Sequence, residues 1–239
     1  MAEFGKILNE TLSNEGGFSN DPKDDGGMTL FGIARAKNPN WGGWPEVDKI
    51  IKVNNLNASD RDHWDDIARL CKKIKSVEEF YRSNFWNKIK GEEIFVNVVA
   101  QSIFDYGVNA GMGTSIKCLQ RTLKIVDDGD FGPTTLKTLN NYTMENSLFK
   151  FHVEFTLRKI DRYLRIVKHD PVDERYIFGW VSRSFENIET MYDLDLIVEP
   201  TLLKLYTFVK AGRLDVKVRQ DKQKCIRLSN ECLVAYSIR

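Results

Sequence analysis

The 239-residue sequence predicts a mainly α-helical protein. Apolar residues recur three and four positions apart in several segments, as they do on one face of a helix. The segment 149–167 shows this spacing over its whole length, with basic residues on its other side. Strand-like alternation of apolar and charged residues appears only at 214–219. We therefore expect helices along most of the chain, and the pattern allows a small β element in the C-terminal extension.

The first predicted helix ends at a glutamate. Its apolar stripe begins at Phe4 and leads to Glu15, and Gly16 and Gly17 then end the helix, since glycine readily adopts the left-handed cap conformation. A carboxyl group there meets the negative end of the helix dipole and is partly desolvated. We expect both effects to favour the neutral carboxylic acid, the form that a general acid needs.

A loop rich in aspartate and glycine follows this glutamate. Asp21, Asp24 and Asp25 lie among Gly, Asn, Pro and Ser residues, where the chain turns and solvent favours charged carboxylates. One neutral and one charged carboxyl group are what hydrolysis of a glycosidic bond requires. The same spacing also fits an ordinary helix end followed by an ordinary turn, and spacing alone leaves both interpretations open.

The next segment, 38–45, reads as a loop with two tryptophans, Trp41 and Trp44. If their rings are exposed, they offer sugars an apolar face for stacking. The alternative is that they anchor the loop in the core. Downstream, helical spacing returns in 77–86, 96–108, 114–123 and 149–167.

Longer motifs, in a fixed order, carry a resemblance to a known family. Glu15–Ile33 contains Glu-Gly-Gly-Phe, Asn-Asp-Pro and Asp-Asp-Gly-Gly, and it resembles the signature of the glycoside hydrolase family 108 muramidases, lysozyme-like enzymes often encoded by phages and prophages. The stretches at 80–86 and 104–111 are similar to that family's Tyr-Arg and Asp-x-x-Val-Asn-x-Gly motifs. The stretches at 118–136 and 179–183 are similar to the predicted peptidoglycan-binding region that accompanies the family.

The resemblance implies a lysozyme-like fold and assigns candidate site residues. Glu15 corresponds to the family's catalytic acid, Asp24 to its second carboxylate with Asp21 as the next candidate, and Thr29 to a threonine shared with other lysozyme-like sites. Candidate substrate-binding residues are Trp41 and Trp44 from the loop and Tyr106 and Asn109 from the Asp-x-x-Val-Asn-x-Gly stretch.

Charge and cysteine content narrow the function further. Lysine and arginine number 35 against 34 aspartates and glutamates, giving a net charge of +1, so the chain lacks the overall basic excess typical of nucleic-acid binding. The four cysteines form no Cys-x-x-Cys pair and the three histidines are scattered, so we expect no metal site and no cofactor. The interpretation that fits best is four free thiols, buried or partly buried, in a protein that folds in a reducing cytoplasm.

The chain begins Met-Ala-Glu-Phe-Gly-Lys without a signal-peptide pattern, and it contains no apolar run of membrane-spanning length. We expect synthesis in the cytoplasm and action on the cell wall or periplasm after release by a holin-like pore or by lysis.

These observations predict a catalytic region at 1–90, a helical peptidoglycan-binding region at 91–185 packed on it, and an extension of unknown role at 186–239. The extension is locally basic, so it either binds anionic wall polymers or packs as a further structural element. The predicted reaction is cleavage of the β-1,4 bond between N-acetylmuramic acid and N-acetylglucosamine. Alternatives are a lytic transglycosylase, which needs one acid/base glutamate, and a non-catalytic protein that binds the wall or assists secretion.

Overall fold

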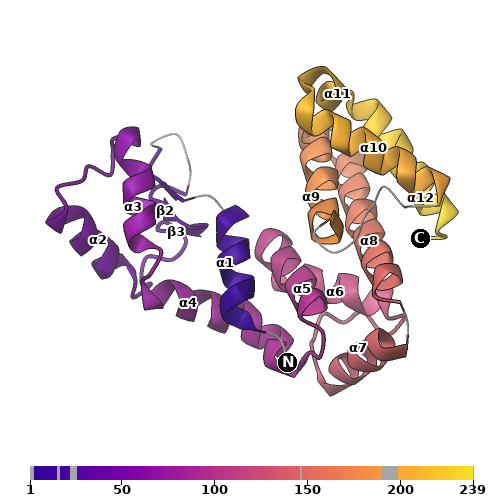
Figure 1. Cartoon of the computed structure of the whole chain (residues 1–239), viewed down its shortest axis with the longest axis horizontal. Coiled ribbons are helices and arrows are strands. Elements are labelled where there is room, and N and C mark those ends of the chain that lie inside the picture. The colour runs from indigo at the N-terminus through magenta and orange to yellow at the C-terminus, as the bar shows by residue number, and fades with distance from the viewer. Residues whose placement is uncertain (1–2, 15–16, 22–25, 146, 190–198, 239) are drawn as a thin grey trace. The chain divides into compact units, whose positions relative to one another are not determined.

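The computed structural model describes residues 3–14, 17–21, 26–145, 147–189 and 199–238 (Figure 1). The chain divides into two compact units, residues 1–93 and 94–239. Each unit is described by itself below.

The first unit combines four α-helices with a small sheet among its described residues (Figure 1). The helices are α1 (Phe4–Asn14), α2 (Trp44–Val53), α3 (Trp64–Cys71) and α4 (Lys75–Tyr81), with short turns η1 (Arg61–His63), η2 (Arg82–Trp86), η3 (Asn87–Ile89) and η4 (Gly91–Glu93), and the strands are β1 (Phe18–Ser19), β2 (Thr29–Leu30) and β3 (Ile33–Ala34).

Helix α1 carries the apolar stripe that the sequence predicts. Phe4, Ile7, Leu8 and Leu12 are all buried, and the Phe4 ring lies 5.2 Å from that of Trp86. Burial of one face against the rest of the unit is what stabilises so short a helix, because isolated helices of this length are marginal in water. The described part of the helix ends at Asn14.

The sheet is antiparallel, in the order β1-β2-β3. Phe18, Leu30 and Ile33 are paired across the strands, and all three are buried. Ser19 and Thr29 are paired on the opposite face and are partly exposed. The alternation therefore gives the sheet one apolar face toward the core and one polar face.

The second unit is helical throughout its described residues, and α8 packs against α6, α9 and α12 (Figure 1). Its elements are α5 (Asn97–Ala110), α6 (Met112–Thr122), α7 (Pro133–Glu145), α8 (Leu148–His169), η5 (Pro171–Tyr176), α9 (Ile177–Glu189), α10 (Pro200–Leu214), α11 (Val216–Gln220) and α12 (Lys222–Ala235).

The mainly α, lysozyme-like fold class is confirmed, but the described residues of the C-terminal extension form helices and no strand. The alternation at 214–219 predicted a strand wrongly, because residues Val216–Gln220 form helix α11. The Asp215 carboxylate caps this helix by accepting a hydrogen bond from the Lys217 amide at 2.8 Å. Leu214 and Val216 are exposed, so the alternation does not reflect burial of one strand face.

The extension packs on the second unit through its helices, with α10 against α9 and α12 against α8 and α9. The four cysteines are free and buried, as predicted. Among the described residues, none of the helices combines the length and the apolar character needed to span a bilayer.

Candidate active site and glycan-binding residues

Gly17, the last residue of the Glu-Gly-Gly motif, is held in place by a backbone hydrogen bond and by close packing. The Gly17 carbonyl accepts a hydrogen bond of 2.7 Å from the Phe31 amide. A Cβ atom built on Gly17 would lie only 2.8 Å from the Cβ of Ala68 in α3, closer than carbon atoms approach in proteins. Gly17 is therefore required by close packing, a role beyond the helix stop that the sequence predicts.

The turn that contacts Gly17 is itself anchored to α4. Phe31 and Gly32 join β2 to β3 with φ values of 47° and 81°, the left-handed conformations of a tight hairpin turn. The Tyr81 hydroxyl donates a buried hydrogen bond to the Phe31 carbonyl. The motif at 80–86 thus supports the backbone that borders the predicted catalytic segment.

Thr29 lies on the polar face of the sheet, opposite Ser19. Its hydroxyl donates a 3.2 Å hydrogen bond to the carbonyl of Gly27, which has a φ of 60°. The side chain therefore faces the polar side of the hairpin and stabilises the end of the aspartate-rich loop.

Asp21 is the predicted site aspartate that the structure describes. Its Oδ2 atom accepts a hydrogen bond of 2.6 Å from Arg61 Nη2, and the Arg61 guanidinium lies 5.4 Å from the centre of the Trp64 ring. This ion pair fixes Asp21 to η1, with 30% of the Asp21 side chain exposed. Glu15, Asp24 and Asp25 lie outside the described residues, so their catalytic roles remain predictions.

The two tryptophans of the 38–45 loop differ in exposure. Trp44 is 2% exposed, its indole N–H donates to the Asn38 carbonyl at 2.7 Å, and Arg35 covers its ring. The prediction that Trp44 binds sugar is therefore wrong, because the ring belongs to the core. Trp41 is partly exposed; it packs edge-on against Trp44 at 4.9 Å and donates to the Ser76 carbonyl.

Tyr106 and Asn109 also differ. Tyr106 is 3% exposed, its ring packs edge-on against Phe155 and Tyr163, and burial raises the pKa of its hydroxyl. Neighbouring rings cover Tyr106, and this burial argues against the prediction that it binds substrate. Asn109 is exposed at a hollow of about 290 Å³ that also contains Trp180.

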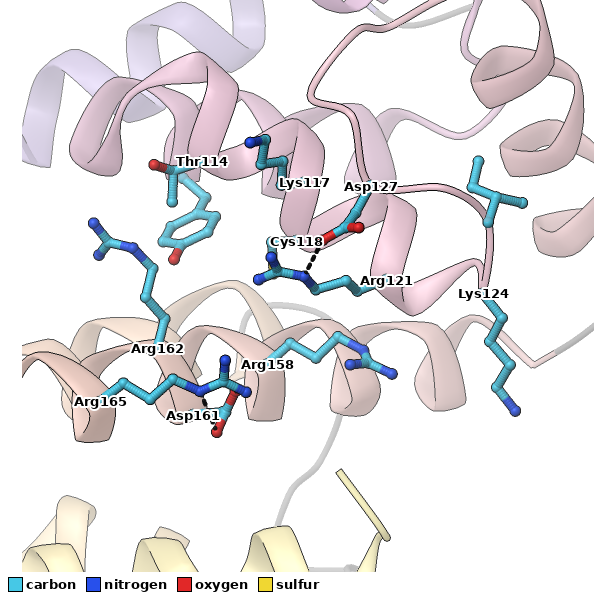
Figure 2. Close-up of a pocket in the computed structure, with 12 residues that line it drawn as sticks. Thr114, Lys117, Cys118, Arg121, Lys124, Asp127, Arg158, Asp161, Arg162 and Arg165 are labelled. Atoms are coloured by element: carbon cyan, nitrogen blue, oxygen red, sulfur yellow. Dashed lines mark hydrogen bonds and ion pairs between the residues drawn. The ribbon is translucent and has the colours of Figure 1, made fainter. Parts of the chain in front are cut away.

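Sequence reasoning missed a larger feature of the second unit, a basic cleft of about 700 Å³ between α6 and α8 (Figure 2). The available signal was the spacing of basic residues on both helices, Lys117 and Arg121 on α6 and Arg158, Arg162 and Arg165 on α8. The sequence analysis noted only the basic residues of α8. It could not combine them with those of α6, because nothing in the sequence shows that the two helices pack together. Among the described residues, no group of three or more His, Cys, Asp or Glu side chains is placed to hold a metal ion.

Two family models match this chain, one after the other. Residues 8–111 match the family model described as glycosyl hydrolase 108, and residues 114–185 match one described as a predicted peptidoglycan domain. The first match extends beyond the first unit and includes α5, while α10 to α12 lie outside both matches. Together the matches support a peptidoglycan hydrolase.

The resemblance seen in the sequence is thus confirmed. Residues 8–111 are similar to the glycosyl hydrolase 108 family, and the residues that follow are similar to the predicted peptidoglycan domain. A solved structure of Brucella abortus SagA is similar, with a TM-score of 0.51 and 21% sequence identity, over 78% of this chain and 92% of that chain. At this identity the likeness shows a shared fold. No curated protein matches the chain.

Proposed function

We propose that the protein is an N-acetylmuramidase that hydrolyses the β-1,4 bond between N-acetylmuramic acid and N-acetylglucosamine in peptidoglycan. The observation that carries the proposal is the match of residues 8–111 to glycosyl hydrolase 108, a span that contains the whole Glu15–Ile33 motif. The structure supports the proposal near the two ends of this motif. There the Phe31 amide bonds to the Gly17 carbonyl, and the Tyr81 hydroxyl bonds to the Phe31 carbonyl.

In the proposed reaction, Glu15 protonates the oxygen of the leaving sugar as the glycosidic bond breaks. Asp24 stabilises the oxocarbenium-like centre or activates the attacking water, and Asp21 is the next candidate for that role. Thr29 is a candidate polar neighbour of these carboxyl groups, and it lies on the polar face of the hairpin, paired with Ser19.

Mass spectrometry of digested sacculi tests this proposal. A muramidase releases muropeptides with reducing N-acetylmuramic acid ends, whereas a lytic transglycosylase releases anhydro ends and a non-catalytic wall-binding protein releases nothing. Reducing ends on N-acetylmuramic acid support the proposal. Anhydro ends, reducing ends on N-acetylglucosamine, or no release from a folded protein would reject it.

Peptidoglycan lies outside the cytoplasmic membrane, so the protein must reach the wall to act on it. We propose that a holin-like pore or lysis releases it. Fractionation of producing cells with and without such a pore tests this step, because release should depend on the pore or coincide with lysis. Appearance in the periplasm of intact cells without a pore would contradict it.

A further inference from the structure

The basic cleft in the second unit is built from two matching helix faces (Figure 2). On α6, Thr114, Lys117, Cys118 and Arg121 are spaced three and four residues apart, and on α8, Arg158, Asp161, Arg162 and Arg165 repeat the same spacing. Residues at these spacings share one side of a helix. The packing of α6 on α8 therefore gathers side chains that lie about forty residues apart in the sequence.

Charge is not balanced inside the cleft. Its lining contains six basic and two acidic side chains. Both acids already have partners, since Asp127 pairs with Arg121 and Asp161 with Arg165, each at 2.6 Å. Within the described part of the chain, no carboxylate pairs with the remaining basic residues, which are Lys117, Lys124, Arg158 and Arg162.

Among these basic side chains, Arg158 has a buried hydrogen-bond donor that is not satisfied. Its Nε atom is buried and makes no hydrogen bond within the described residues. Burying a charged donor without a partner is costly, so such a group is a natural contact for an anionic ligand. The thiol of Cys118 is no candidate nucleophile, because burial raises its pKa to about 12 despite the nearby cations.

Arg162 lines both the cleft and the hollow that contains Asn109. The hollow adds Trp180, whose ring stacks on that of Tyr163 at 5.1 Å. A partly exposed aromatic ring beside polar groups suits a sugar, while the cleft suits negatively charged groups.

We propose that the cleft between α6 and α8 binds the free carboxylates of the peptide stems of peptidoglycan. The proposal rests on peptidoglycan being the substrate. Residues 114–185, which match the predicted peptidoglycan domain, include every lining residue except Tyr106. Arginine binds carboxylates in a bidentate, charge-assisted manner, so Arg158 and Arg162 are the main contacts, with Lys117 and Lys124 as flanking charges.

The test measures binding of the full chain to a purified disaccharide-tetrapeptide monomer by isothermal titration calorimetry. This monomer is a muramidase product, so binding is measured apart from cleavage. The comparison ligand is the same monomer with its peptide carboxylates amidated. We expect tighter binding of the unmodified monomer, with the difference shrinking as salt is raised.

Three cleft variants are informative. Arg158→Gln combined with Arg162→Gln should weaken binding of the unmodified monomer roughly tenfold or more, because charge-assisted hydrogen bonds are lost. Lys117→Gln with Lys124→Gln changes exposed side chains only, so it keeps the test valid if the arginine variant unfolds. It should weaken binding by a smaller factor. Arg158→Lys with Arg162→Lys should retain part of the affinity.

The matched control is Lys168→Gln with Lys217→Gln, which removes the same charge from exposed positions outside the cleft. It should bind the monomer like the unmodified chain. Equal weakening by the control and the cleft variants would overturn the proposal, because a general charge effect would then explain binding. Equal affinity for the amidated and unmodified monomers would also overturn it.

Product analysis keeps the two proposals separate. If sacculi are not cleaved but the monomer binds through Arg158 and Arg162, the muramidase proposal fails and the cleft assignment stands. If sacculi are cleaved to the expected products but cleft variants bind the monomer normally, the cleft assignment alone fails.

Discussion

The Arg61 guanidinium donates a 2.6 Å hydrogen bond to the carboxylate of Asp21 and so ties the strand end after β1 to η1. Arg61 is itself positioned over the ring of Trp64, which packs edge-on against Phe18 of β1. Asp21 therefore has a structural partner already, while the family frame assigns the second catalytic carboxylate to Asp24. We therefore expect replacement of Asp24 to affect catalysis and replacement of Asp21 to affect mainly stability.

Replacing Asp24 by asparagine should lower kcat roughly a hundredfold, because an acid/base or charge-stabilising carboxylate typically contributes that much. Asp25→Asn should change kcat much less. Asp21→Asn should cost no more than about 1 kcal/mol of unfolding free energy, since its ion-pair partner Arg61 is largely exposed. Rates of muropeptide release and urea melts measure these effects. If Asp21→Asn or Asp25→Asn is the slowest variant, the second carboxylate is misassigned.

Replacing Glu15 by glutamine should abolish wall cleavage, with a loss of roughly 10² to 10⁴-fold, because the amide keeps the shape but cannot donate the proton. The melting temperature should stay unchanged. Glu3→Gln, at an exposed position just before α1, is the matched control and should cleave normally. A Glu15→Gln protein that releases muropeptides at a normal rate would refute the muramidase assignment.

Gly17→Ala should destabilise the first unit by about 1 to 3 kcal/mol, because its Cβ would lie 2.8 Å from that of Ala68 and force the hairpin or α3 to shift. Gly42→Ala serves as the control, since no atom lies within 4 Å of the added Cβ, and it should stay within about 0.5 kcal/mol. Chemical denaturation of both variants measures the difference. Equal stability would show that the Gly17 contact relaxes without cost.

The C-terminal extension is held to α9 by Arg213, which donates to the side chain and carbonyl of Ser182 and pairs with Glu189. Arg213→Met should cost about 2 kcal/mol, because these partly buried acceptors lose a charged donor. The exposed pair of Arg227 and Glu231 offers a control, and Arg227→Met should cost less than about 0.5 kcal/mol. Thermal melts compare the two.

A truncation after Ile188 should be insoluble or unfolded, because it removes the helices that cover α8 and α9. This packing supports the structural alternative for the extension over a purely electrostatic one. A soluble, cooperatively melting truncation would contradict the prediction.

His152 makes stability depend on pH. It is 1% exposed beside Ser102, and burial lowers its pKa from 6.5 to about 3. Between these values the unfolded chain binds more protons than the folded one, so stability falls as pH drops from 6.5 toward 3. From pH 6.5 to 5 this histidine should remove up to about 2 kcal/mol.

Urea denaturation across that range tests the effect. His152→Gln should show a smaller loss, while His169→Gln, which changes an exposed histidine, should show the same loss as the unmodified chain. Identical pH profiles for His152→Gln and the unmodified chain would rule out this source of the dependence.

Periodicity and composition determined the helical class, the buried stripe of α1 and the free buried thiols. These features depend on residues that are close in sequence, or on residue type alone, so local patterns reveal them. The ordered motifs also indicated the resemblance to glycoside hydrolase family 108, which the matches over 8–111 and 114–185 confirm.

Only the tertiary structure decided which of the predicted site residues are buried, and which neighbours bury them. Trp44 and Tyr106 are of residue types that often bind sugars, yet both side chains are buried in the core. Arg35 packs on Trp44, and Phe155 packs on Tyr106. Alternation at 214–219 is typical of a strand, but Val216–Gln220 form helix α11, which the Asp215 cap favours. The basic cleft exists because α6 and α8 pack together, and contacts between distant segments leave no periodic signal in the sequence.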